Sequence, residues 1–502
     1  MTNYITKMYH MWVEYQFKWS GGGSVKLPAI ADLTAKKGNA KATIKWTDPD
    51  DVVVEWYTLA ERASTKLVRK AWSAPANSED GTLVLTETVK NSYSSTGYED
   101  TWLTNGTTYY YVAFAVSDAW AETASAPVSV TPKATQKFTI SWTETSTPWS
   151  FNPTYSDDAQ WLSAGSTAFD EFFNYSAVRL DTSWNVTAEV EQTTPWQLDF
   201  SQLWTLTSGD NVMIKFPLMW IKMTKSGSTV TLSITDDPDA TSDGFQYYAH
   251  CTGTLSNPWT PKNAFYLWAY EASNNGSNVL KSWSGKSPEA SQTQATSCSR
   301  ASANGSGYNI IWYYQRQFVN ALYMMKYGNP DSQTVVGRWF VDWNSASHIT
   351  WWLDSQLSAT WGETAWKTQC KLFWLEDWWG NVHEWIWWVY TDWNKNLCVQ
   401  LSWYSGAVSG WESTWSTIQH TWSGYDLSSI VWNNKVLFWP SATVNNSNYN
   451  TYYCDYANVS ASGLAAAGGH WSDGSIAGAF RLAVTYGASG SSARIGSRLM
   501  FL

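Results

Sequence analysis

Glycine is scarce in this chain for the number of turns that its sequence calls for, whereas tryptophan is abundant. The 502 residues include 31 glycines and 38 tryptophans. Many tryptophans stand between turn-forming residues, at places where a positive φ or a tight reversal normally requires glycine. These positions include Trp184, Trp196, Trp259, Trp343, Trp393 and the pairs Trp351-Trp352 and Trp387-Trp388. The chain therefore carries its largest side chain where the smallest is expected.

Two explanations fit this exchange of residue types. A carbohydrate-binding protein enriched in aromatic residues for sugar stacking would gather them on one face, but these tryptophans are scattered through turns along the whole chain. We therefore favour the hypothesis of an alternative genetic code, in which UGA codons meant as glycine are translated here as tryptophan. Such a code indicates a candidate-phylum bacterium or a phage that infects one, and the codons at these positions decide the question.

Charge is also sparse, and positive charge does not gather anywhere. Only 15% of the residues are charged, the formal net charge is −10, and no basic run occurs. Binding to nucleic acid through phosphate contacts requires clustered Lys and Arg, so we expect no nucleic-acid partner.

Long apolar runs are missing as well. No stretch of eighteen apolar residues could span a membrane, and residues 1–23 lack the hydrophobic segment and cleavage site of a signal peptide. We expect no membrane insertion. For a protein that acts outside the cell, this favours export by assembly into a virion and release by lysis.

The five cysteines are widely spaced, and no two form a CxxC motif. This excludes both a typical zinc motif and a disulfide framework and predicts isolated buried thiols. No Ser-His-Asp ordering, glycine-rich phosphate loop or paired-carboxylate motif suggests an enzyme by another route.

The chain divides into three predicted parts. Residues 1–25 form a short attachment segment that ends in a Gly-rich hinge, and residues 26–133 alternate as short strands separated by polar turns. The segment Leu103–Tyr109 resembles the corner before strand F of fibronectin type III domains, and Trp46 stands where their buried strand-B tryptophan does. The resemblance implies a spacer domain in which Tyr109 is structural, with its hydroxyl bonded to nearby backbone.

Residues 138–502 read as one long, loop-rich domain. Residues 212–217 and 229–234 are strand-like, and apolar residues at spacings of three and four predict a helix over 311–327, the longest in the chain. Its single apolar stripe predicts packing on a sheet.

The segment Leu375–Trp385, with Gly380-Asn381-Val382-His383-Glu384-Trp385 at its centre, resembles the signature of the formylglycine-generating-enzyme type of C-type lectin fold. The closing segments around Gly468-Gly469-His470-Trp471, Ala477–Arg481 and Gly496–Leu499 more specifically resemble the variable proteins of diversity-generating retroelements, which occur on phage tail fibres and bacterial surfaces. The resemblance implies an α+β C-type lectin fold over 138–502, with a variable region at about 445–502. The family usually has Trp at the position of His383. Trp379, Trp385 and Trp471 match family tryptophans, whereas Trp374, Trp387, Trp388 and Trp393 are expected glycines.

The enzymes of this fold use a copper site built from two nearby cysteines. Cys398 and Cys454 are far apart in the chain, and neither has a second thiol beside it. We therefore expect a protein that is not an enzyme and needs no cofactor.

Three polar residues of the first block, Asp377, Asn381 and Glu384, lie within an aromatic stretch. Burial would force each to find a partner, and we expect backbone amides of the long loops. A calcium site that uses Asn381 and Glu384 is the alternative. His383 and His470 could serve a metal or acid–base role, but we expect structural roles and no metal site.

The variable region alternates residues of frame type with small or polar residues of the kinds that adenine-directed mutagenesis produces. These residues predict a ligand-binding surface, because paratopes use the same types. They are Asn458, Ser460, Ser462, His470, Ser472, Asp473, Ser475, Thr485, Tyr486, Ser489, Ser491 and Arg494.

The expected function is a hypervariable receptor-binding protein on a phage tail, a homotrimer that recognises a host cell-surface protein or glycan. The alternatives are a bacterial cell-surface adhesin and a structural virion protein that binds no ligand.

Overall fold

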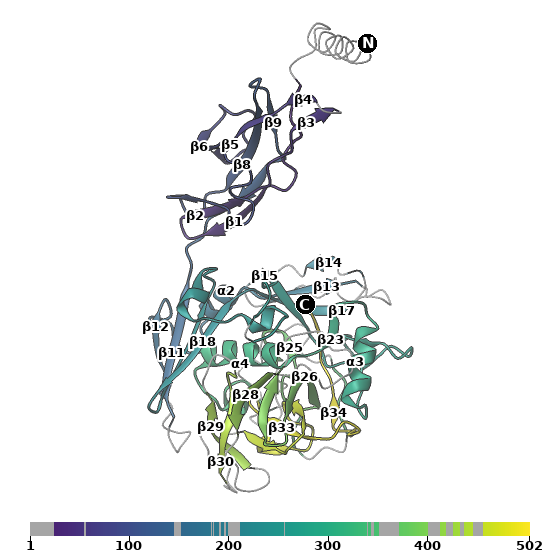
Figure 1. The fold of residues 1–502 in the computed structure, drawn as a ribbon. Coiled ribbons are helices and arrows are strands. Elements are labelled where there is room, and N and C mark those ends of the chain that lie inside the picture. The colour runs from purple at the N-terminus through teal and green to yellow at the C-terminus, as the bar shows by residue number, and fades with distance from the viewer. Residues whose placement is uncertain are drawn as a thin grey trace. The chain divides into compact units, whose positions relative to one another are not determined.

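The computed structural model describes most of the chain, and the chain divides into two compact units, Met1–Thr135 and Gln136–Leu502. The described residues are 25–54, 57–144, 152–181, 183, 185–189, 192–194, 197–198, 211–255, 257–338, 340–342, 346–350, 371–399, 412–417, 425–431, 436–444 and 455–502. The division falls in the gap left between the two predicted domains. The protein consists mostly of β-sheets with few helices (Figure 1).

Several sequence-based expectations fall outside the described residues. They concern the attachment segment and hinge at 1–24, the tryptophans at 184, 196, 343, 351 and 352, the cysteines at 370 and 454, and the first part of the variable region, 445–454. The three described cysteines, Cys251, Cys298 and Cys398, are free and buried, as expected. No helix in the described residues is long and apolar enough to cross a membrane.

The first unit is built from strands that form two main sheets. A three-stranded sheet has the order β1 (Thr34–Gly38), β2 (Lys41–Lys45), β7 (Tyr98–Thr101). The second sheet has the order β10 (Val128–Val130), β8 (Tyr109–Ser117), β5 (Arg62–Ala71), β6 (Thr82–Glu87), and β9 (Glu122–Ala124) also pairs with β8. The short strands β3 (Val52–Val54) and β4 (Tyr57–Ala60) pair with each other. One core, which includes Ile44, Trp46, Leu67 and Tyr111, joins the two main sheets.

Two residues of this unit take the structural roles expected for them. Trp46 is only 1% exposed, and the Tyr109 hydroxyl accepts a hydrogen bond from the Thr104 amide at 3.1 Å. The tyrosine therefore fixes the turn before β8, which confirms its predicted contact with nearby backbone.

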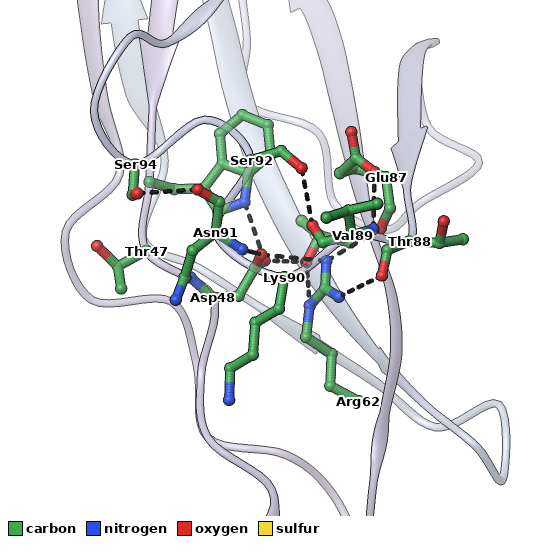
Figure 2. A network of polar contacts seen from close by, with 12 residues as sticks. Thr47, Asp48, Arg62, Glu87, Thr88, Val89, Lys90, Asn91, Ser92 and Ser94 are labelled. Atoms are coloured by element: carbon green, nitrogen blue, oxygen red, sulfur yellow. Dashed lines mark hydrogen bonds and ion pairs between the residues drawn. The ribbon is translucent and has the colours of Figure 1, made fainter.

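A buried carboxylate, Asp48, ties the loop after β6 to the core (Figure 2). It accepts hydrogen bonds from the Trp46 indole at 3.0 Å and the Asn91 amide at 2.7 Å, and it pairs with Arg62 at 3.1 Å. The Arg62 guanidinium in turn donates to the Glu87 carbonyl. Because charged hydrogen bonds between buried groups are stronger than neutral ones, this network fixes a loop with little apolar surface of its own.

The described residues of the second unit form three larger sheets. A four-stranded sheet has the order β12 (Thr154–Asp157), β11 (Lys137–Thr143), β19 (Thr229–Thr235), β18 (Trp220–Ser226). A six-stranded sheet has the order β14 (Val186–Glu189), β13 (Ser176–Leu180), β17 (Asn211–Pro217), β20 (Ala264–Trp268), β35 (Leu499–Phe501), β23 (Tyr308–Ile310). A nine-stranded sheet has the order β28 (Glu412–Thr417), β27 (Asn396–Val399), β26 (His383–Thr391), β32 (Leu464–Ala467), β33 (Leu482–Tyr486), β31 (Tyr456–Val459), β29 (Tyr425–Val431), β30 (Trp439–Val444), and β34 (Ile495–Gly496) pairs with β26.

Short two-stranded ladders and a few helices complete this unit. The ladders are β15 (Gln192–Thr194) with β16 (Gln197–Leu198), β21 (Ser273–Asn274) with β22 (Leu280–Lys281), and β24 (Lys371–Leu372) with β25 (Leu375–Glu376). The α-helices are α2 (Ala168–Phe173), α3 (Gln294–Ser302), α4 (Tyr313–Tyr327) and α5 (Ser332–Val335), and short 3₁₀ turns cover Ala240–Asp243, Tyr248–His250 and Gly474–Ile476.

The helix α4 lies inside the second unit and is its longest described helix, as predicted (Figure 1). It begins two residues later than expected and ends at Gly328, which adopts a φ of 57°. The expected single apolar stripe is wrong, because every residue from Tyr313 to Lys326 is buried. Two of its buried polar residues have partners: Asn320 donates to the Ala479 carbonyl, and Lys326 pairs with Asp170.

Among the described residues, four tryptophans have the backbone conformation that favours glycine. Trp72, Trp102, Trp120 and Trp374 have φ of 70°, 64°, 61° and 72°. A bulky residue at positive φ is a steric outlier, and the first three also expose at least 71% of their surface. Of the tryptophans expected to be glycines, Trp374 has this conformation, but Trp387 and Trp393 do not. The steric reason for glycine therefore fails at those two positions; Trp387 and Trp388 lie instead in β26, at a register shift between Ile386 and Tyr390.

Replacing Trp102 by Gly should stabilise the first unit by about 1 kcal/mol, because a Cβ is disfavoured in the left-handed region and the indole is 95% exposed. Chemical denaturation measures the change. Trp46→Gly is the control, and loss of this buried indole should cost about 3–5 kcal/mol. A Trp102→Gly variant that is less stable than the parent would contradict the argument.

The free energy of unfolding should also depend on His250 below pH 6.5. Its ring is fully buried against Phe265 and Phe318, and burial lowers its pKa to about 3. Between the unfolded pKa of 6.5 and the folded pKa of about 3, the unfolded chain binds a proton that the folded chain does not. Stability therefore falls as pH falls in this range, by up to about 1.4 kcal/mol per pH unit. His250→Gln, which can keep the hydrogen bond to the Pro217 carbonyl, should have a shallower slope in denaturation curves recorded from pH 7 to 5. Equal slopes would refute the assignment.

Candidate functional site

Three charged side chains form a buried cluster where α4, β26 and the C-terminal segment meet. Glu384 accepts from Arg316 Nη1 at 2.7 Å and from Arg498 Nε at 2.6 Å, and all three side chains are at most 2% exposed. Both carboxylate oxygens are thus occupied by guanidinium groups. Charge pairs of this quality offset the large cost of removing the ions from water.

The two arginines extend the cluster to the surrounding backbone. Arg498 donates to the carbonyls of Trp268 and Glu376, so it joins β20 and β25. Arg316 donates to the Trp378 carbonyl at 2.7 Å, and its guanidinium lies 4.0 Å from the centre of the Trp378 ring. The cluster therefore connects segments that are more than two hundred residues apart in the sequence.

The sequence-based assignments for the first block are right for Asn381 and wrong for Glu384. Asn381 Oδ1 accepts from the backbone amide of His348 at 2.7 Å, which is the expected loop contact. Glu384 binds the two arginines instead of loop amides. The alternative calcium site at Asn381 and Glu384 also fails, because the arginines occupy both Glu384 oxygens.

Sequence reasoning missed Glu271, which binds the side-chain amide nitrogen of Asn381. Glu271 Oε2 accepts from Asn381 Nδ2 at 2.6 Å, and Asp377 accepts from the same nitrogen at 3.3 Å. Burial raises the pKa of both carboxyl groups well above the usual range, and nearby carboxylates raise it further. The signal in the sequence was a charged residue inside the largely apolar stretch 264–272.

The twelve residues predicted to bind ligand are all described, and they differ in exposure. The exposed ones are Ser462, Ser475, Ser489, Ser491 and Arg494; Asn458, Ser460, Ser472, Asp473, Thr485 and Tyr486 are partly buried; His470 is buried. Residues between them, such as Ala465, Ala479 and Ile495, are at most 1% exposed. The same segment thus alternates between frame and surface.

The structure brings these residues together in two groups. In the first, the Arg494 guanidinium lies 5.2 Å from the centre of the Trp471 ring, so Arg494 lies beside the loop that carries Ser472 and Ser475. The second group is Ser460, Ser462 and Thr485. It lies where β32 begins beside the end of β33, and there the Ser460 backbone amide donates to the Val484 carbonyl. Tyr486 packs edge-on against Trp385 with the ring centres 5.2 Å apart.

His470 and Asp473 do not face solvent as predicted, because they form a buried polar cluster with His383. Nε2 of His470 lies 3.1 Å from one Asp473 oxygen, and Nε2 of His383 lies 3.4 Å from the other. Arg481 Nη2 is 3.8 Å from the same carboxylate. The prediction of exposed side chains is therefore wrong at these two residues. The loop that carries them packs closely, since a Cβ at Gly469 would come within 2.6 Å of Ala477 Cβ.

Both imidazole rings of this cluster are neutral at pH 7. Burial lowers the pKa of His383 to about 3 and that of His470 to about 4, although Asp473 acts in the opposite direction. The pKa of Asp473 is lowered, because burial is outweighed by His383, Arg481 and His470. The cluster therefore presents two neutral imidazoles and one carboxylate.

Comparison with known proteins yields no family assignment. No family model and no curated protein matches the chain. Among solved structures, one described as "Myokine structure" is similar at 17% identity over 22% of this chain and 99% of that chain, with a TM-score of 0.14. The α-L-rhamnosidase of Streptomyces avermitilis complexed with L-rhamnose is similar at 10% identity over 42% of this chain and 22% of that chain, with a TM-score of 0.16. Scores this low support neither a fold nor a function.

Replacing Glu384 by Gln should destabilise the second unit by about 3–5 kcal/mol, because it leaves two buried guanidinium groups without a countercharge. Thermal or chemical denaturation measures the loss. Glu289→Gln is a matched control, since its ion pair with Arg300 is partly exposed and should contribute no more than about 1 kcal/mol. Equal effects of the two substitutions would show that the cluster has no special role.

Proposed function

We propose that this protein is a hypervariable receptor-binding protein of a phage tail, which recognises a host cell-surface protein or glycan. In this proposal the second unit is a ligand-binding domain of the C-type lectin fold, similar to the variable proteins of diversity-generating retroelements. The first unit is a fibronectin type III-like spacer. The protein binds and does not catalyse, and it acts as a homotrimer on the virion.

The observation that carries the proposal is the division of residues 455–502 into frame and surface. Buried residues such as Ala466 and Leu499 hold the segment in the core, whereas Ser475, Ser489 and Arg494 lie exposed between them. Substitutions at exposed loop positions usually change stability by no more than about 0.5 kcal/mol. A segment built in this way can vary its surface residues without loss of the fold.

The chemistry of the surface also suits recognition. The exposed positions offer small hydroxyl groups and one guanidinium, and the partly buried ring of Trp471 lies beside that guanidinium. Binding surfaces combine rigid aromatic area with small, adaptable polar groups in the same way. Loops of this kind on a rigid frame are common sites of binding function.

The tryptophans at positive φ support the proposed alternative genetic code. A gene that reads UGA as glycine would place glycine at Trp72, Trp102 and Trp120, where the backbone favours it and the indole is exposed. Such a code fits a phage or a host from a candidate phylum.

The test is a triple variant of the exposed serines, Ser475→Arg, Ser489→Arg and Ser491→Arg. It should abolish binding to arrayed bacterial surface glycans and envelope proteins that the parent recognises, because three large charged side chains would occupy the contact surface. The melting temperature should stay nearly unchanged.

The matched control carries the same three charges on other exposed serines of the second unit, as Ser226→Arg, Ser228→Arg and Ser242→Arg. It should bind as the parent does. If the first variant also binds like the parent, the recognition surface lies elsewhere and the proposal is wrong.

A further inference from the structure

A buried hydrogen-bonded network joins the loop 469–475, which follows β32, to the first residue of β26. The backbone amide of Gly469 donates to Nδ1 of His383 at 3.2 Å. The backbone amide of Ser472 donates to Nδ1 of His470, also at 3.2 Å. An imidazole nitrogen that accepts a hydrogen bond carries no proton, so each neutral ring has its proton on Nε2. The loop amides therefore fix the tautomer of both histidines.

Asp473 accepts the proton of each ring on a different oxygen. Nε2 of His470 lies 3.1 Å from Oδ1 of Asp473, and Nε2 of His383 lies 3.4 Å from Oδ2. The backbone amide of His470 also donates to Oδ2, at 3.0 Å. With both rings neutral and Asp473 ionised, each of these hydrogen bonds has one donor and one acceptor. The network is thus complete only in this protonation state.

A second proton on either ring would break one of the contacts that hold the loop. It would have to bind Nδ1, where it faces the hydrogen of a loop amide. Another acceptor lies near each ring: the Ala467 carbonyl is 3.4 Å from Nδ1 of His383, and the Ser472 hydroxyl is 3.2 Å from Nδ1 of His470. Even if Nδ1 donates to one of these groups, the loop amide loses its acceptor, and a buried N–H without an acceptor is unfavourable. Protonation therefore favours a loop that has moved away from the rings.

The surroundings of the two rings also oppose a positive charge. Both histidine side chains are at most 8% exposed, and this burial is the main reason that the pKa of His383 falls to about 3 and that of His470 to about 4. Arg481, which lies 3.8 Å from Asp473, lowers both pKa values further, and Arg494 lowers that of His470. In an open loop each ring would return toward the ordinary histidine pKa of about 6.5.

Other charged groups border the loop from the elements packed against it. A Cβ at Gly474 would lie 3.9 Å from Arg338 and Asp342, which pair with each other at 2.6 Å. Arg316 approaches Gly468 from α4 and is paired with Glu384. From β33, Tyr486 has a pKa raised above its ordinary value by burial, so it does not titrate below pH 7.

Asp455 is the one neighbour that acts in the opposite direction. It contacts the segment after the loop, because its Oδ2 accepts from the Phe480 amide at 2.7 Å, and burial raises its pKa well above the ordinary range. A group with a raised pKa stabilises the closed form as pH falls. Opening on acidification must therefore come from the histidines, which variants of these residues can show.

We propose that the loop 469–475 is an acid-sensitive switch, which stays on β26 while His383 and His470 are neutral and opens when they take up a second proton. Trp471, Ser472 and Ser475 lie on this loop, so under the proposed function acid would also loosen the receptor-binding surface. The switch itself does not rest on the proposed function, because its test measures opening of the loop and uses no ligand.

The experiment is hydrogen–deuterium exchange of the full chain between pH 7 and pH 5, with each rate divided by the intrinsic rate at the same pH. Each histidine should increase the open fraction by up to about tenfold per pH unit, since the open loop binds a proton that the closed loop does not. The protection of peptides that cover 469–475 should therefore fall by more than about a hundredfold over this range. Peptides of α4 should stay far better protected at every pH.

The matched variants replace each histidine by a residue that cannot titrate. The side-chain oxygen of Asn can accept the loop amide as Nδ1 does, so His383→Asn and His470→Asn should each reduce the fall to roughly twentyfold, and the double variant should abolish it. His348→Asn, which alters a histidine outside the network, should keep the fall of the parent. Circular dichroism at pH 7 checks that each variant is folded.

The parent alone decides the question if a variant does not fold. The proposal is overturned if the loop peptides of the parent lose no protection between pH 7 and pH 5, or lose it only together with the peptides of α4. It is equally overturned if the folded double variant loses protection as steeply as the parent.

Discussion

The pairing of Glu384 with Arg316 and Arg498 is the constraint on which the second unit depends. An unpaired charge in this interior would cost several kcal/mol, so the three side chains must be brought together whenever the unit folds. Because Arg316 lies on α4, Glu384 on β26 and Arg498 beside β35, their pairing fixes the helix between elements of two sheets. The carbonyl contacts of Arg498 then position β20 and the turn that carries Trp378.

The surface loops inherit their positions from this frame. The backbone amide of Trp471 donates to the Asn381 carbonyl, and that of His383 donates to the Arg494 carbonyl, so both loops are attached to the start of β26. One residue farther along, Glu384 holds the buried cluster. The proposed receptor-binding loops are therefore attached to backbone that adjoins the buried cluster. Variation at the exposed serines would leave these backbone contacts intact.

The sequence predicted elements with local signals and missed contacts that depend on distant residues. The helix at α4 was predictable because its apolar spacing and Gly328 are local features, and the Tyr109 corner was predictable from a short motif. The arginine partners of Glu384 were not, because they lie 68 and 114 residues away in the chain. The burial of His470 and Asp473 is not predictable from sequence, because a polar residue in a loop carries no local sign of burial. Only the fold places His383 beside them.

The central claim is that a rigid frame carries loops that are free to vary, and hydrogen–deuterium exchange of the full chain tests it most directly. Amides that open only by global unfolding exchange slowly, whereas amides of exposed loops with few buried contacts exchange through local motion. We predict that peptides covering α4 and the start of β26 exchange orders of magnitude more slowly than the loop 487–494. The loop should exchange fast even though it leads directly into β34, which pairs with β26. Comparable exchange rates in these segments would contradict the account.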